Sequence, residues 1–212
     1  NQQTGDIELY KRPLTKKEKK LFTEEDINKK NPVLWFGENQ MTGNKILLLS
    51  KLKTKELDSL KIIGNAFIIE KDSLSKDGFN QIKGGKLNGD FVDGKLNNIE
   101  IIKNSQVIYY LYSDENNELI GINKTLCSSP DMIMINNEIS DITFYTNPNG
   151  EVFPEEDINM NERKLKGFIW RLNEKPKNKN DLFSKNDKEL IFPEIKEIEI
   201  PDSFFSKFNF NK

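Results

Sequence analysis

The chain has 212 residues, 35% of them hydrophobic, with 32 Lys and Arg against 34 Asp and Glu. The formal charge of −2 excludes a net attraction for nucleic acid, and the absence of histidine excludes Ser-His-Asp and Cys-His catalysis and every His-ligated metal site. The single cysteine, Cys127, excludes an internal disulfide, and no apolar run reaches the length of a membrane-spanning helix.

The first expected element is a short helix in a charged N-terminal extension, residues 1–32. Thr15 and Glu18 have the spacing of a capping box, and the Lys-rich stretch after them predicts a helix that ends near Phe22. Because the chain begins with Asn1 and shows no signal-type apolar segment, we expect it to be a processed or excised segment.

Residues 33 to about 154 have the pattern of an all-β core. Apolar runs of strand length alternate with turn-forming pairs such as Asp77-Gly78, Asn88-Gly89 and Asp93-Gly94. A further turn is expected at Asn147–Gly150. The expected strands are Ile46–Leu49, Leu60–Ile63, Ala66–Ile69, Ile99–Ile102, Val107–Tyr112, Met132–Ile135 and Ile142–Tyr145.

The C-terminal part of the chain is less regular. We expect a helical turn at about residues 159–166 and a strand-like apolar run at Gly167–Trp170. Residues 173–212 are expected to form a Lys- and Asn-rich linker and a tail whose aromatic residues need a covering partner. Those aromatic residues are Phe204, Phe205 and Phe208.

A repeat runs through the predicted β domain. Its first block opens at Asn39, Asn80 and Asn123, at intervals of 41 and 43 residues. Its second block follows in step and ends in Asn65, Asn104 and Asn147. A fixed period of this length indicates one supersecondary unit stacked on copies of itself, so that neighbouring units bury a continuous core together.

Apolar and polar residues alternate within the second block, which predicts that each strand has one buried face and one solvent-exposed face. The strands that follow would supply an opposing wall, so that two sheets lie face to face. The space between them is either an ordinary filled core or an open-sided trough that holds an apolar ligand. The periodicity of the sequence is compatible with both alternatives. The candidate trough residues are Leu60, Ile62, Phe67, Ile69, Ile99, Ile101, Val107, Tyr109, Met132, Met134, Ile142 and Phe144.

A series of short sequence segments in residues 33–172 is similar to a known family. The segments are Asn65–Ile69, Gly78–Gly84, Gly89–Phe91, Val107–Tyr110, Gly121–Lys124 and Gly167–Arg171. In this order they resemble the OstA-like proteins of the Bacteroidota, in the organic-solvent-tolerance superfamily that includes the periplasmic lipopolysaccharide-transport protein A. The tail after Asn180 has no counterpart in this resemblance.

The resemblance implies a twisted, V-shaped β-jelly roll built of repeats, without an enzymatic activity or a cofactor. It implies a periplasmic location, possible association with the outer membrane, and transport of lipopolysaccharide or a related lipid with its acyl chains shielded. The expected partners are the lipid and other transport-bridge or outer-membrane proteins, which would dock on the sheet ends by β-augmentation. Lys83, Lys86 and Lys95 would meet phosphates at the rim.

Three other interpretations are weaker. The same fold with a filled interior would serve as a structural scaffold in an outer-membrane complex. A polysaccharide-binding or polysaccharide-cleaving solenoid would use Asp90 and Asp93, although Asp-Gly pairs usually form turns. Calcium would need ligand spacing that neither residues 84–90 nor residues 114–118 have, and Cys127 is better explained as a small residue at a bend than as a reactive thiol.

Overall fold

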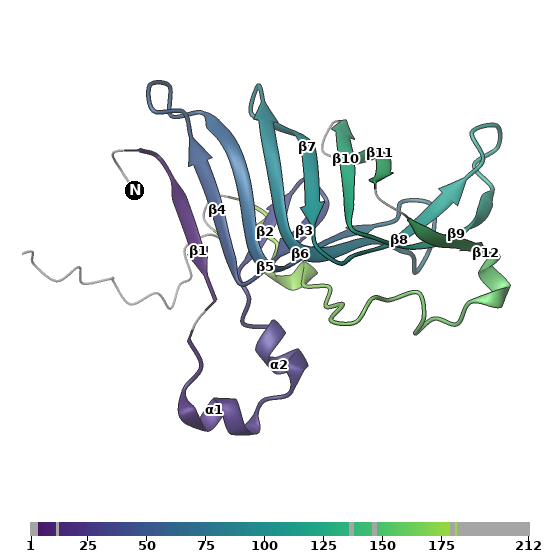
Figure 1. Ribbon diagram of the computed structural model, residues 1–212, viewed down its shortest axis with the longest axis horizontal. Coiled ribbons are helices and arrows are strands. Elements are labelled where there is room, and N and C mark those ends of the chain that lie inside the picture. Colours follow the sequence, from purple (N-terminus) through teal and green to yellow (C-terminus); the bar gives the residue numbers. More distant parts are fainter. Residues whose placement is uncertain (1–3, 12, 136–137, 146–147, 179–180, 182–212) are drawn as a thin grey trace, which may run out of the picture. The chain divides into compact units, whose positions relative to one another are not determined.

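The computed structural model describes residues 4–11, 13–135, 138–145, 148–178 and 181, except for the side chains of 134, 135 and 138. The chain forms two compact units, residues 1–173 and 174–212. The first unit contains a 12-stranded antiparallel sheet that folds over into two walls (Figure 1). In the second unit, backbone N–H groups of Lys177 and Asn178 donate hydrogen bonds to the carboxylate of Asp181.

Two long strands, β5 (Leu57–Lys71) and β6 (Phe79–Val92), run through both walls and join them. Residues 57–63 of β5 and 86–92 of β6 belong to wall A, whose other strands are β1 (Ile7–Tyr10), β4 (Lys45–Ser50), β7 (Lys95–Ile102), β10 (Ser129–Ile135) and β11 (Glu138–Tyr145). Residues 66–71 of β5 and 79–84 of β6 belong to wall B, whose other strands are β2 (Val33–Phe36), β3 (Asn39–Thr42), β8 (Ser105–Tyr112), β9 (Leu119–Cys127) and β12 (Asn149–Phe153).

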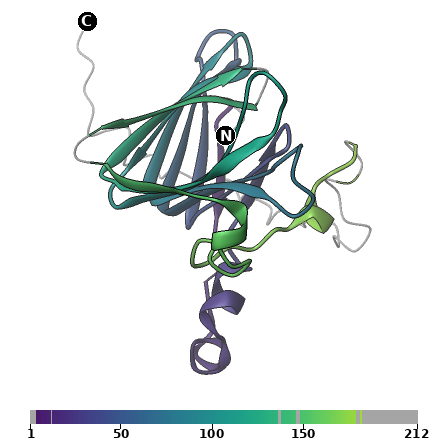
Figure 2. The same ribbon diagram turned by 90° about the vertical axis from the view of Figure 1, so that its right-hand side faces the viewer.

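The walls meet along a line of bends, which we call the spine (Figure 2). In β5 a bulge at Gly64 and Asn65 lies opposite Gly85 of β6. The two bulge residues have left-handed φ angles, 76° at Gly64 and 53° at Asn65. The return from β7 to β8 uses a second left-handed pair, Lys103 and Asn104, with φ angles of 72° and 50°. Asparagine adopts this conformation more readily than most residues, which explains why the first two copies of the second block end in Asn, at Asn65 and Asn104.

The repeat seen in the sequence is one passage across both walls. The first block lies on a strand of wall B, in β3, β6 and β9, and the chain then crosses the spine. The second block forms a strand of wall A, in β5, β7 and β11. The predicted all-β fold, built of stacked repeats with two facing sheets, is therefore confirmed.

Local patterns at the N-terminus also predict the structure well. Helix α1 (Lys16–Leu21) begins after Thr15, which forms a complete capping box with Glu18, and it ends before Phe22. A second capping box, at Thr23 and Asp26, starts α2 (Glu24–Asn28). The described residues include no helix long and apolar enough to cross a membrane.

Several predicted boundaries are wrong. The expected turn at Asn88-Gly89 lies inside β6, whereas Asp93-Gly94 forms a tight hairpin with left-handed φ angles of 50° and 73°. The two strands expected at residues 60–63 and 66–69 are one strand, because a bulge bends the chain without ending the ladder. Of the turn expected at 147–150, Asn147 lies outside the described residues, and Asn149 and Gly150 belong to β12.

The segment after β12 contains the expected helical turn in a shorter form, at residues 159–163, but not the expected strand. A 3-10 helix, η1 (Glu155–Asp157), is followed by a single turn in which the N–H groups of Glu162 and Arg163 donate to Asn159. Residues 167–170 pair with no strand. A second 3-10 helix, η2, spans Leu172–Glu174. Figure 1 shows this segment running along wall B, and we call residues 154–171 the strap.

Candidate functional site: the space between the walls

The space between the walls is filled by the protein's own side chains near the spine. Leu60 and Ile62 from wall A and Ile68 and Ile82 from wall B are each 0% exposed. They belong to one hydrophobic cluster that also takes in partly buried residues of the strands at both ends of the walls, including Leu9, Leu34, Ile142 and Phe144. Near the spine, the filled-core interpretation of the sequence therefore applies.

Most of the predicted trough residues are brought together in this cluster. It contains Leu60, Ile62, Ile99, Ile101, Val107 and Met132 as buried members and Tyr109, Ile142 and Phe144 as partly buried ones. Met134 pairs with Ile139 in the β10–β11 ladder, but its side chain lies outside the described part of the chain. Whether these side chains contact a lipid stays a prediction.

Phe67 and Ile69 lie on the other face of wall B, contrary to the prediction that they face wall A. Because β5 is one continuous strand, the inward phase set by Leu60 and Ile62 carries on through Ala66 and Ile68. Phe67 and Ile69 point the opposite way and line a cavity beneath the strap. They were expected to face wall A as part of a separate following strand, whereas the phase of the continuous strand places them on the other face.

A row of polar side chains crosses the inner face of wall B farther from the spine. Asn39 pairs with Glu70, and Glu70 pairs with Asn80, whose Nδ2 donates to a Glu70 carboxylate oxygen at 3.0 Å. Asn80 Oδ1 accepts the backbone N–H of Tyr110 at 3.0 Å and so continues the row onto β8, where Tyr109 pairs with Asn123 of β9. The opening Asn of all three repeats therefore belongs to this row.

The row leads to an opening between the ends of the walls, which we call the mouth. It is a cavity of about 250 Å³ lined by Tyr109, Leu111, Asn123, Ser140, Asp141, Ile142 and Phe144. Ligand pockets for drug-sized molecules generally measure roughly 300–1,000 Å³. The mouth in this closed form therefore has room for part of one chain of an amphiphile, and a larger ligand requires the walls to separate.

Two contacts hold the walls together at their ends. Phe36 of wall B packs edge-on against Phe91 of wall A, with ring centroids 5.5 Å apart. At the mouth the Tyr109 hydroxyl donates to the Ile139 carbonyl over 3.5 Å, a long and weak hydrogen bond. Burial raises the pKa of Tyr109, and the carboxylates of Glu70, Asp72 and Asp141 raise it further. Of these three carboxylates, Asp141 lines the mouth.

The outer face of wall B is covered by the strap, through two glutamines at equivalent places in the repeat. Gln40 donates to the Ile169 carbonyl at 2.8 Å and accepts the Arg171 N–H at 2.6 Å. Gln81 likewise donates to the Arg163 carbonyl at 2.7 Å and accepts the Leu165 N–H at 2.8 Å. Each side-chain amide thus acts as a strand partner for the strap.

Aromatic rings complete the strap contact. Trp170 lies edge-on to Trp35 at a centroid distance of 5.0 Å, and Phe168 lies edge-on to Phe79 at 5.1 Å. The strand-like run of the sequence is therefore apolar because it buries rings against wall B, without joining the sheet.

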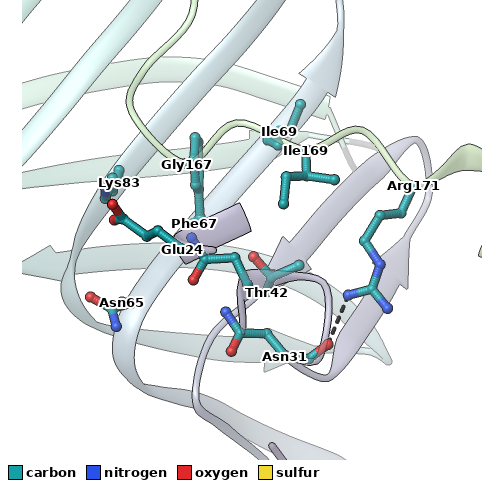
Figure 3. Close-up of a pocket in the computed structure, with 11 residues that line it drawn as sticks. Glu24, Asn31, Thr42, Asn65, Phe67, Ile69, Lys83, Gly167, Ile169 and Arg171 are labelled. Atoms are coloured by element: carbon teal, nitrogen blue, oxygen red, sulfur yellow. Dashed lines mark hydrogen bonds between the residues drawn. The ribbon is translucent and has the colours of Figure 1, made fainter. Parts of the chain in front are cut away.

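Figure 3 shows the cavity of about 70 Å³ between α2, wall B and the strap. Lys83 crosses the ring of Phe67 and donates to the Lys166 carbonyl at 2.7 Å, while Arg171 donates to the Asn31 carbonyl at 2.7 Å. Burial lowers the pKa of Lys83. Lys83 therefore fastens the strap instead of standing at the rim with the exposed Lys86 and Lys95.

The Asn and Gln of each repeat opening are the residues that the sequence analysis overlooked. Their signal was present, because Asn39-Gln40 recurs as Asn80-Gln81, and one member faces in while the other faces out. The third copy has Lys124 in place of the glutamine, and beneath it a cavity of about 480 Å³ separates β9 from the strap.

The residues considered for catalysis or metal binding are placed as follows. Asp90 is exposed on β6 and Asp93 forms the hairpin turn. Within the described residues, no group of three or more Cys, Asp and Glu side chains is placed to hold a metal ion. Cys127 is buried at the spine, and burial raises the pKa of its thiol.

Comparisons with known proteins add little. No family model matches the chain, and no curated protein matches it. One solved structure is similar, that of LptH, described as the LptA-homologous periplasmic component of the conserved lipopolysaccharide transport device from Pseudomonas aeruginosa. The two chains are 14% identical with a TM-score of 0.39, over 57% of this chain and 79% of the other. The fold given above rests on strand order and register.

Proposed function

We propose that this protein binds and carries a lipid, with an acyl chain held between the two walls and entering at the mouth. The observation that carries the proposal is the joined hydrophobic cluster, which runs between the walls and reaches the partly open positions Ile142 and Phe144. Each CH₂ moved from water into such a space contributes about 0.8 kcal/mol. This function needs no catalytic group.

The resemblance to the OstA-like proteins makes lipopolysaccharide or a related lipid the cargo and the periplasm the place of action. Transport-bridge or outer-membrane proteins would then dock on the free edges of the sheet. Strands β1, β2, β11 and β12 end the pairing in both walls and leave backbone donors and acceptors for another strand. Docking by β-augmentation at these edges would pass lipid between carriers.

The experiment uses a photo-crosslinking residue at Phe144, inside the mouth, in protein purified from its native cell envelope. Tyr145 is the matched control, because it is the next residue of β11 and is 50% exposed on the other face. We expect mass spectrometry to find a lipid attached at position 144 and none at 145. Equal crosslinking at both positions, or none at either, would contradict the proposal.

A substitution separates binding from folding. Phe144→Asp should abolish lipid capture and leave the fold intact, because Phe144 is only partly buried, and Tyr145→Asp should leave capture unchanged. Ile101 is a poorer position for this test, since it is 0% exposed at the spine and a charge there would unfold the protein.

The filled interior near the spine favours a second candidate function, a structural scaffold. A scaffold would keep its walls closed and would act through its sheet edges and its C-terminal residues. Deleting residues 204–212 would then break a protein complex without affecting lipid capture. A protein that carries no lipid from the envelope but crosslinks to other proteins from position 145 would favour this function.

A further inference from the structure

The mouth combines an apolar floor with a lip made of neutral and acidic groups. Leu111, Ile142 and Phe144 supply the floor. We infer, on the basis of the proposed lipid binding, that the mouth selects amphiphiles whose headgroup is an uncharged hydrogen-bond donor, a hydroxyl or an amide, over amphiphiles that carry a phosphate.

The lip offers acceptor oxygens to a ligand, beside the N–H donors of the Asn123 amide. The Asp141 carboxylate accepts a hydrogen bond from the Ser140 hydroxyl at 3.0 Å and has further lone pairs that are free to accept. The Asn123 side-chain oxygen accepts a hydrogen bond from the Thr125 hydroxyl at 2.8 Å and has a second lone pair. None of the described residues that line the mouth is a lysine or an arginine. A hydroxyl or amide headgroup can donate to these oxygens, whereas an ionised phosphate has only acceptors to offer.

Electrostatic repulsion also favours an uncharged headgroup over a phosphate. Asp141 lines the mouth itself. The carboxylates of Glu70 and Asp72 do not line it, but together with Asp141 they add to the effect of burial in raising the pKa of Tyr109. Charges of the same sign repel each other, and more strongly where water is partly excluded. A phosphate at the mouth would meet this repulsion without a compensating cation.

The cations of this region lie on the opposite side of wall B. Lys83 is fastened to the strap, and Lys124, Lys164 and Lys166 line the cavity between β9 and the strap. These lysines face away from the space between the walls, since Gln81 and Lys83 share the strap face of β6 while Ile82 belongs to the inner cluster. They cannot neutralise a phosphate at the mouth.

The test compares two amphiphiles with the same chain, dodecyl glucoside and dodecyl phosphate, below their critical micelle concentrations. Calorimetry would give the dissociation constants for the whole chain, for Asp141→Lys and for the control Asp90→Lys, which reverses an exposed charge on β6. We expect the unaltered protein and Asp90→Lys to bind the glucoside at least about tenfold more tightly. Asp141→Lys should bring the two affinities within about threefold.

The outcomes separate the two proposals. Equal binding of both amphiphiles by the unaltered protein, unchanged by Asp141→Lys, overturns the headgroup inference and leaves lipid binding standing. If neither amphiphile binds, both proposals are overturned, and binding of the phosphate alone overturns the headgroup inference. Circular dichroism of each variant confirms that a changed preference comes from a folded protein, since Asp141 is exposed and its replacement removes no buried contact.

Discussion

Glycine at the spine is required by the side chain that packs on it. Gly43 and Gly84 occupy equivalent places in the first two repeats, and a Cβ on either would overlap the Cγ2 atom of an isoleucine in the neighbouring strand, Ile62 or Ile101. The third repeat has Cys127 at this place, a small residue that is also buried. Close packing at the spine thus explains the small residues of the repeat without a functional role.

Gly84→Ala should lower the free energy of unfolding by about 1–3 kcal/mol, because overpacking a tight core forces neighbours off their preferred positions. Denaturant unfolding measures the change. Gly89→Ala is the control and should cost less, since its Cβ would lie 3.0 Å from the flexible end of Leu96 and at ordinary contact distance from the Asn98 carbonyl oxygen and the Leu60 Cβ atom. Equal costs for the two variants would contradict the packing argument.

The strap is an element without a ladder of its own. Side-chain amides of Gln40 and Gln81 replace the missing strand partner, and both glutamines are almost fully buried, at 1% and 0% exposure. A buried backbone group that loses its partner costs about 1–3 kcal/mol. The two glutamines therefore contribute to the attachment of the strap, together with the rings of Phe168 and Trp170.

Gln81→Ala should release the middle of the strap, because it leaves the Leu165 N–H and the Arg163 carbonyl without their partner. Hydrogen exchange should show faster exchange of the Leu165 amide, and the melting temperature should fall. Gln106→Ala serves as the control, since Gln106 lies half-buried on β8 at the edge of a cavity. Unchanged exchange at Leu165 in Gln81→Ala would show that the aromatic rings alone hold the strap.

The two walls form one cooperative structure, because β5 and β6 run through both. Leu60 lies in wall A, whereas Trp35 and Trp170 pack on the outer face of wall B. A substitution that destabilises one wall should therefore destabilise the other equally, and we expect no stable intermediate in which only one wall is folded.

Leu60→Ala should lower stability by about 2–5 kcal/mol, the usual cost of a buried leucine. The melting temperature should fall equally by tryptophan fluorescence, which reports on wall B, and by far-ultraviolet circular dichroism, which reports on all strands. Lys61→Ala, on the exposed face of the same strand, should change neither. Two separate transitions in Leu60→Ala would mean that the walls unfold independently.

Local signals carried the correct predictions. The capping box at Thr15 and Glu18, the Asp93-Gly94 hairpin and the period of the repeat depend on neighbours in sequence, and the structure contains all three. The alternation in the second block likewise placed Ile99 and Ile101 in the core. The proposed boundaries at residues 32 and 172 stay predictions.

The sequence by itself determined that the chain is an all-β protein of stacked repeats, because alternation, turns and period are properties of the backbone and of nearest neighbours. Only the tertiary structure decided that Phe67 and Ile69 face the strap, that two glutamines pin it, and that the space near the spine is filled. These outcomes depend on strand phase across a bulge and on the volumes of side chains from distant strands, which meet only after the sheet has folded over.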